Sequence, residues 1–333
     1  MAFMAYLRAD SSKLSWPTGR PVELDAPLDW ACSGRGWNCC VGNAIPLTPY
    51  DVVRVRHATH KTSQQMIDEG LTTFEWRGGL MTAWFAHVPF QGNKRACVFY
   101  EELTNDGVRR VREEEPERFA SFPPEVQRAA DRTGDYRVTA LCAIHANRPE
   151  ACRAFPFMLR SDWNEQPEQP AAEVVHRCGT CALKKKTTVR QVMLDNDLEQ
   201  FWRPAEAWRI IKLYLVSRGL GHANDPKYRS LPLDLSTRTE IWNNCFNPDA
   251  FDVVAERFPD QWHISEDLAG DDQILRLVLT STLDRVDALV AESGIAIEDL
   301  GLIGEPPAVR PNLDRLLDPS RPVLPVIAAA VAS

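Results

Sequence analysis

The chain has 333 residues, of which 44% are hydrophobic, and its formal net charge is −8. This length suits two domains, and the apolar fraction is enough for a real core without disulfide support. The acidic balance argues against nucleic acid as a partner. No apolar run reaches the roughly 20 residues of a membrane-spanning helix, so no membrane partner is expected. The first residues lack a secretory apolar segment, so the predicted location is cytoplasmic.

The first 30 residues contain Pro17, Pro21 and Pro27 and are predicted to form an extended lead-in. Thr48-Pro49 then has the chemistry of a helix start, with threonine as N-cap and proline at the first helical position. A second helix is expected from Thr62 or Ser63 to a stop at Gly70.

From Thr72 to Tyr100 short apolar runs separated by breakers predict strands. The strongly charged stretch from Glu101 to Pro124 is interpreted as a solvated insertion. A short helix from Pro124 to Arg132 and a strand from Tyr136 to Leu141 are predicted after it.

Beyond Thr187 the pattern becomes helical. Trp208, Ile211 and Leu215 form a stripe at helical spacing that ends at Gly219, and a further helix is predicted from Asn247-Pro248 to Pro259. The longest helix should run from Asp271 to Ser293 and stop at Gly294, and the proline-rich tail from Pro306 should be extended. The predicted fold is therefore α+β, with a small irregular cysteine-rich domain of short strands (1–187), a helical domain (188–305) and an extended tail (306–333).

Nine cysteines, an odd number, are better explained in a reducing compartment as ligands than as a disulfide framework. Cys245 stands alone in the helical part and is predicted to be a buried, small apolar side chain. The other eight are predicted metal ligands: Cys32, Cys39, Cys40, Cys97, Cys142, Cys152, Cys178 and Cys181.

Two of these groupings carry a local signal. In Cys178-Gly179-Thr180-Cys181 the spacing lets two thiolates face one metal across a tight turn, although a redox dithiol has the same spacing. The adjacent Cys39-Cys40 can serve two irons of a cluster, or one of them can bind while the other packs. His145 and His176 lie near ligating cysteines, but a solvent-facing role is the simpler interpretation for each.

The segment from Cys142 to Phe157 has the form C-x-I-x3-R-P-x2-C-R-x-F-P-F. It resembles the signature of the CxxCxxCC (YkgJ-type) cysteine-cluster proteins, described as zinc- or iron-chelating domains and grouped with flagellin lysine-N-methylases. Cys97-Val98-Phe99 resembles an upstream strand of that family, and Cys39-Cys40 resembles the end of its eponymous motif. The likeness spans roughly residues 30–181, but Gly36 stands where the family has a cysteine. One usual ligand is therefore missing, or it is replaced by Cys178 or Cys181.

An almost all-sulfur ligand set suits zinc or an iron–sulfur cluster, and eight cysteines exceed the four of one structural zinc. We therefore expect an iron–sulfur cluster, [4Fe–4S] by preference, with zinc as the alternative. Arg148 and Arg153 are predicted to offset the negative charge of the thiolates and donate to sulfur, although Arg148 could equally pin the turn before Pro149.

Three functions follow as hypotheses. The first is a cluster protein that supports catalysis or electron transfer with a redox partner. The second, implied by the resemblance, is a methyltransferase that uses S-adenosylmethionine on a protein lysine. The third is a structural zinc module joined to a helical interaction domain. The sequence has no dinucleotide-binding glycine fingerprint.

Overall fold

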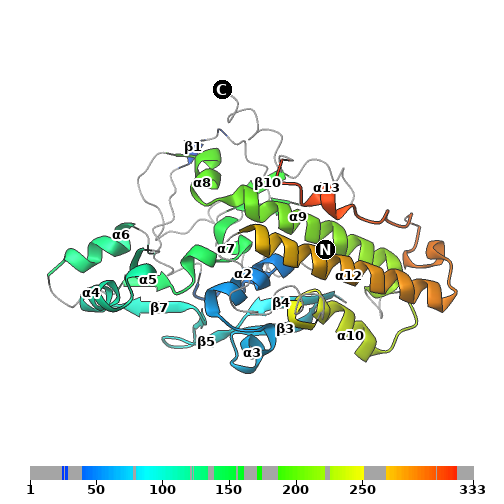
Figure 1. Cartoon of the computed structure of the whole chain (residues 1–333), viewed down its shortest axis with the longest axis horizontal. Coiled ribbons are helices and arrows are strands. Elements are labelled where there is room, and N and C mark those ends of the chain that lie inside the picture. The colour runs from blue at the N-terminus through cyan, green and yellow to red at the C-terminus, as the bar shows by residue number, and fades with distance from the viewer. Residues whose placement is uncertain are drawn as a thin grey trace. The chain divides into compact units, whose positions relative to one another are not determined.

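A computed structural model describes residues 25, 27–28, 40–77, 80–120, 122, 124–133, 139–154, 157–160, 171–174, 187–221, 226–250, 268–304 and 306–320. The fold is α+β, which confirms the predicted class in that general sense (Figure 1). The contacts divide the chain into two units. One contains Pro46–Trp84 and Gln200–Val323, and the other contains Asp10–Ile45 and Phe85–Glu199. Within the described ranges, no helix combines the length and the apolarity that crossing a bilayer requires.

The first unit begins with a small sheet and two capped helices. Helix α2 starts where Thr48 accepts a hydrogen bond from the Asp51 backbone N–H while the Asp51 carboxylate accepts one from Thr48, a complete capping box. Thr62 caps α3 in the same way through Gln65. Both predicted helix starts are confirmed. The elements of this part are β2 (Pro46–Leu47), α2 (Pro49–Thr59), α3 (Ser63–Asp68), β3 (Thr72–Arg77) and β4 (Leu80–Phe85), with β4 between β2 and β3 in the sheet.

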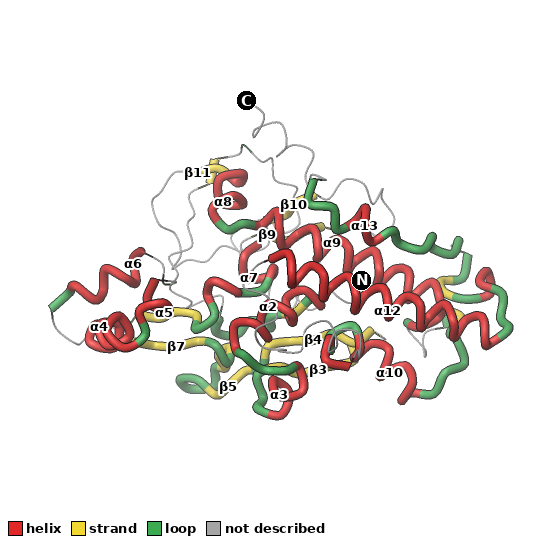
Figure 2. Tube along the Cα trace, in the orientation of Figure 1, coloured by secondary structure: helices red, strands yellow, loops and turns green. Residues whose placement is uncertain are grey.

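Helices dominate the rest of this unit, as Figure 2 shows. The predicted stripe is buried: Ile211 and Leu215 are fully covered, and Trp208 packs edge-on against Trp242 and Phe246. Gly219 ends this segment with φ +78°, as predicted. The elements are α9 (Leu198–Leu215), η4 (Val216–Leu220), β12 (Tyr228–Arg229), α10 (Leu235–Asn244), η5 (Pro248–Ala250), α12 (Leu268–Ser293), η6 (Ile297–Asp299), β13 (Gly301–Leu302) and α13 (Leu313–Leu316).

Helix α12 is the predicted longest helix and ends before Gly294, which has φ +66°. It packs on α2, where Val53 joins Ile274 and Val278 in a buried cluster. The tail prediction needs a correction, because the short helix α13 interrupts it and Asn312 caps that helix by accepting from the Arg315 backbone N–H. The helix predicted after Pro248 is described only as the turn η5, and its remainder lies outside the described residues.

The second unit contains short antiparallel ribbons. Strand β5 (His87–Pro89) pairs with β6 (Arg95–Cys97), and β7 (Tyr100–Leu103) pairs with β8 (Thr139–Cys142). Residues 40–42 run along the other edge of β6, where Val41 bridges to Ala96. The remaining pairs are β1 (Pro27–Leu28) with β11 (Thr187–Thr188), and β9 (Phe157–Arg160) with β10 (Ala171–Val174).

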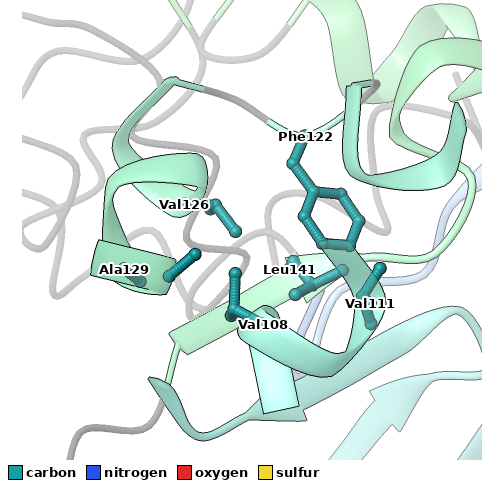
Figure 3. Packing of buried hydrophobic residues seen from close by; sticks show 7 residues of the cluster. Val108, Val111, Phe122, Val126, Ala129 and Leu141 are labelled. Atoms are coloured by element: carbon teal, nitrogen blue, oxygen red, sulfur yellow. The ribbon is translucent and has the colours of Figure 1, made fainter. Parts of the chain in front are cut away.

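The charged stretch after β7 forms helices with a core of their own, so its interpretation as a solvated insertion is wrong. Val108, Val111 and Phe122 are buried against Val126 and Leu141 (Figure 3). The charges lie on the outer faces of the helices, while these apolar residues at helical spacing face inward. The helices of this unit are α4 (Asn105–Glu114), α5 (Pro116–Ala120), α6 (Pro124–Gln127), η2 (Arg128–Asp131), η3 (His145–Asn147), α7 (Glu150–Ala154) and α8 (Val189–Asp195).

Candidate thiol site

Four of the eight predicted ligands are described: Cys40, Cys97, Cys142 and Cys152. All four belong to the second unit and are present as thiols. The other four lie outside the described residues: Cys32, Cys39, Cys178 and Cys181. Cys245 belongs to the first unit, where it is 1% exposed, so its predicted burial is confirmed. The candidate site is therefore built here from the second unit alone.

Cys40 and Cys97 are direct cross-strand neighbours. The Cys97 backbone N–H donates to the Cys40 carbonyl at 2.7 Å, and the Gly42 N–H donates to the Arg95 carbonyl at 2.8 Å. Because these bonds flank the Val41–Ala96 bridge, Cys40 stands opposite Cys97 and both side chains leave the ribbon on the same face. Opposite residues in such pairs have Cβ atoms about 4.5–5.5 Å apart. The register thus brings together two thiols that are far apart in sequence.

The cross-strand row formed by Cys40 and Cys97 extends to a third strand, β5. His87 pairs with Cys97 in β5–β6, so it shares the face of the two cysteines. The Nε2 atom of His87 lies 2.7 Å from the Asn43 carbonyl oxygen, which fixes the ring and leaves Nδ1 as the other ring nitrogen. Phe85 and Phe99 pack edge-on with centroids 4.9 Å apart one step further along these strands. The row is therefore flanked by a buried aromatic pair.

Cys142 approaches this region through the neighbouring ribbon, where it stands opposite Tyr100. The pKa of the Tyr100 hydroxyl is raised, chiefly by burial, then by its hydrogen bond to Glu102 and by the charges of Glu102 and Cys40. Tyr100 thus lies within electrostatic reach of Cys40 while its strand partner is Cys142. Cys40 is thus the strand partner of Cys97, and Cys142 is the strand partner of Tyr100, three residues further along the chain.

The loop between Cys142 and Cys152 is held by two arginines. Arg153 is 4% exposed, and its guanidinium donates to the carbonyls of Arg148, Ala146 and Asn196. Arg148 donates to the His145 carbonyl at 2.9 Å and to the Asn196 side-chain oxygen at 2.5 Å. Burial, followed by the charges of the adjacent Arg148 and Arg153, lowers the pKa of His145 to about 3, so the imidazole is neutral near pH 7.

These contacts bear on the predicted cofactor-binding role of Arg148 and Arg153. Both guanidinium groups donate to loop carbonyls and to Asn196, which is the structural alternative considered for Arg148. A carbonyl cage of this kind shapes the segment that carries Cys142 and Cys152. Direct donation from either arginine to a thiolate or cofactor stays a prediction.

The donor chemistry fits a thiophilic metal centre only in part. Thiols and a neutral imidazole are the ligands that zinc and iron–sulfur centres use. Among the described residues, however, no group of three or more His, Cys, Asp or Glu side chains is arranged to hold a metal ion. A complete ligand set would therefore need cysteines beyond these ranges, from Cys32, Cys39, Cys178 and Cys181.

Sequence reasoning missed His87, Tyr100 and Asn196 as parts of this region. Each is placed by a partner distant in sequence, either a cross-strand neighbour or the arginine pair. The one local signal is that His87 lies in the apolar run Ala83–Val88. No protein-family model, curated protein or solved structure matches the chain.

Proposed function

We propose that this protein binds an iron–sulfur cluster through cysteine thiolates of its second unit. The observation that carries the proposal is the cross-strand placement of Cys40 opposite Cys97, with Cys142 on the adjoining ribbon. Two thiolates held at cross-strand spacing would repel one another unless a cation neutralised them. Eight of nine cysteines at or before Cys181 provide enough sulfur for a four-cysteine cluster.

Burial supports the same proposal. Cys40 is 8% exposed and Cys97 is 3% exposed, so ionising either thiol without a cation would place a negative charge in an apolar setting. A metal centre supplies that cation and deprotonates its ligating thiols outright. The surrounding aromatic side chains Phe85 and Phe99 would limit solvent contact, one of the factors that set the potential of a cluster.

The test is the iron, zinc and acid-labile sulfide content of the full chain after anaerobic purification, with its absorption spectrum. We expect about four irons and four sulfides per chain, with a broad band at roughly 400 nm. Cys40→Ala and Cys97→Ala should each lower iron and sulfide together. Cys245→Ala is the matched control, because it removes a buried thiol of the first unit and should leave both contents unchanged.

Three results would count against the proposal, each in its own way. One zinc per chain without sulfide would replace the cluster by the structural zinc module. Iron that is unaffected by Cys40→Ala and Cys97→Ala would remove this cysteine pair from the ligand set. A chain that binds neither iron nor zinc would refute both the cluster proposal and the zinc alternative.

The methyltransferase hypothesis stays a prediction from the family resemblance. Its test follows the metal measurement: binding of S-adenosylmethionine by equilibrium dialysis, then transfer of a labelled methyl group to a lysine-containing peptide. Loss of S-adenosylmethionine binding on removal of the iron would indicate that this cofactor binds at the cluster. Absence of binding in the metal-loaded chain would leave electron transfer to a redox partner as the role to examine.

A further inference from the structure

A small polar pocket lies between α10 and α12 in the first unit, the unit that contains none of the eight predicted ligand cysteines. Its volume is about 190 Å³. Helix α10 and helix α12 each supply three lining residues: Glu240, Ile241 and Asn244 from the first, and Ser281, Thr282 and Arg285 from the second.

The two helices line the pocket in matching patterns. Each contributes residues at i, i+1 and i+4, positions that share one edge of a helix over one turn. On each side one residue is buried, Ile241 at 3% and Thr282 at 2% exposure. On each side one residue is charged, and the charges are opposite: Glu240 on α10 and Arg285 on α12. The pocket therefore has a covered floor and walls of opposite sign.

The polar groups at the base of the pocket already have hydrogen-bond partners within the protein. The Thr282 hydroxyl donates to the Val278 carbonyl at 2.9 Å, and the Cys245 thiol behind it donates to the Ile241 carbonyl at 3.4 Å. Each of these bonds runs to the carbonyl four residues earlier in its own helix and occupies the polar group at the base. The Cys245 thiol also lies 3.9 Å from the Thr282 hydroxyl of the facing helix. A ligand would therefore be recognised by the walls and not by the floor.

The side chains that form the walls differ from those of the floor in their hydrogen bonding. Within the described part of the chain, the side chains of Glu240, Asn244, Ser281 and Arg285 make no hydrogen bond or ion pair with another residue. A carboxylate, an amide, a hydroxyl and a guanidinium thus converge on one hollow with their donors and acceptors available. The two charged groups are not joined by an ion pair across the pocket, although they flank it.

We propose that this pocket binds a small zwitterion of the α-amino acid class. Arg285 would receive the carboxylate of the ligand, because a guanidinium presents donors in a fork that matches carboxylate geometry. Glu240 would receive the ammonium group, and Asn244 and Ser281 would supply neutral hydrogen bonds. The opposite signs on opposing helices select a molecule that carries both charges over one that carries either alone.

The volume limits the size of the ligand. Liquid water occupies about 30 Å³ per molecule, so the pocket corresponds to roughly six waters. It is smaller than the roughly 300–1,000 Å³ of drug-sized sites. Amino acids with small side chains, such as glycine, alanine and serine, match this space.

The test is isothermal titration calorimetry of the full chain with L-serine, compared with propionate and ethanolamine, which each carry one charge. We expect saturable binding of one L-serine per chain and much weaker binding of the two single-charge probes. Glu240→Gln and Arg285→Gln should each weaken L-serine binding by about tenfold or more, the cost of losing one charge-assisted contact. The exposed Glu298→Gln and Arg315→Gln are matched controls and should bind like the unsubstituted chain.

Three outcomes would overturn the proposal. They are no saturable binding of L-serine at tens of millimolar, binding that neither pocket substitution changes, and binding of propionate as strong as that of L-serine. A double-mutant cycle in thermal unfolding adds a check without ligand. Coupling between Glu240 and Arg285 in that cycle, together with no L-serine binding, would mean that the two side chains serve only to pair with each other. The assay needs no metal, so its failure is separate from failure of the cluster proposal.

Discussion

Arg153→Lys tests whether Arg153 shapes the loop between Cys142 and Cys152 or contacts a bound group. Arg153 is 4% exposed and donates through all three guanidinium nitrogens to backbone carbonyls, at 3.0 Å to Arg148 and 3.2 Å to Asn196 among them. Its ion pair with Asp197 spans 3.7 Å to a carboxylate that is 66% exposed, so that pair adds little.

The magnitude follows from these bonds. A lysine ammonium is a point charge and cannot reproduce a planar fork, so at least two of the three carbonyl bonds are lost. Hydrogen bonds to a charged group contribute about 1.5–3 kcal/mol each, so the loss of two predicts a local destabilisation of roughly 3 to 6 kcal/mol. Since about 1.4 kcal/mol is a factor of ten, amide exchange should accelerate on the order of a hundredfold to ten-thousandfold.

Hydrogen exchange measured by mass spectrometry on peptides covering residues 139–154 and 187–197 reports this loss directly. Arg110→Lys on the exposed face of α4 is the matched control and should leave both peptides unchanged. Exchange in Arg153→Lys within threefold of the unsubstituted chain would refute the framing role. Unchanged protection with reduced iron content would instead support the predicted cofactor contact of Arg153.

Three further predictions concern buried or charged groups. Asp249→Asn should lower the free energy of unfolding by about 3–5 kcal/mol. The reason is that Asp249 pairs with Arg56, which is 1% exposed and would be left as an uncompensated buried charge. Urea denaturation measures this loss, with the exposed Asp299→Asn as the control. Cys245 should resist iodoacetamide in the native chain at pH 8 and react after unfolding, because burial raises the pKa of its thiol to about 12; modification at the rate of an exposed cysteine would contradict this. The pKa of His145 is about 3 in the folded chain and about 6.5 in the unfolded chain, so the unfolded chain binds a proton first as the pH falls. The free energy of unfolding should therefore decrease between pH 6.5 and pH 3, by at most about 1.4 kcal/mol per pH unit. His145→Gln should flatten that slope in unfolding experiments across this range.

The helix boundaries were the part of the fold most accessible from sequence. Thr48-Pro49 and Thr62 predicted helix starts because capping is a contact between residues three apart, visible in any short window. Gly219 and Gly294 predicted stops for the same local reason, a backbone φ that favours glycine.

The stretch from Glu101 to Pro124 shows where such reasoning fails. Its high charge suggested a solvated insertion, but Val108 and Val111 lie three residues apart on α4 and are buried under Phe122. Charge density describes the outer face of a helix, while burial depends on the few residues of the inner face. The inner stripe is short because α4 has only ten residues, too few for the periodicity to stand out against its charged neighbours.

The candidate site divides along the same line between local and non-local information. The cysteine count predicts thiolate chemistry, and Cys178-Gly179-Thr180-Cys181 predicts a local geometry because two thiols three positions apart can face one metal across a turn. Cys40 and Cys97 carry no such local signal, since only the pairing of residues 40–42 with β6 sets them opposite each other. A shift of this register by one residue would turn Cys40 to the other face of the ribbon and separate the pair. The backbone hydrogen bond from the Cys97 N–H to the Cys40 carbonyl therefore fixes the spacing of these two residues. A tight turn would have the same effect on a C-x-x-C pair.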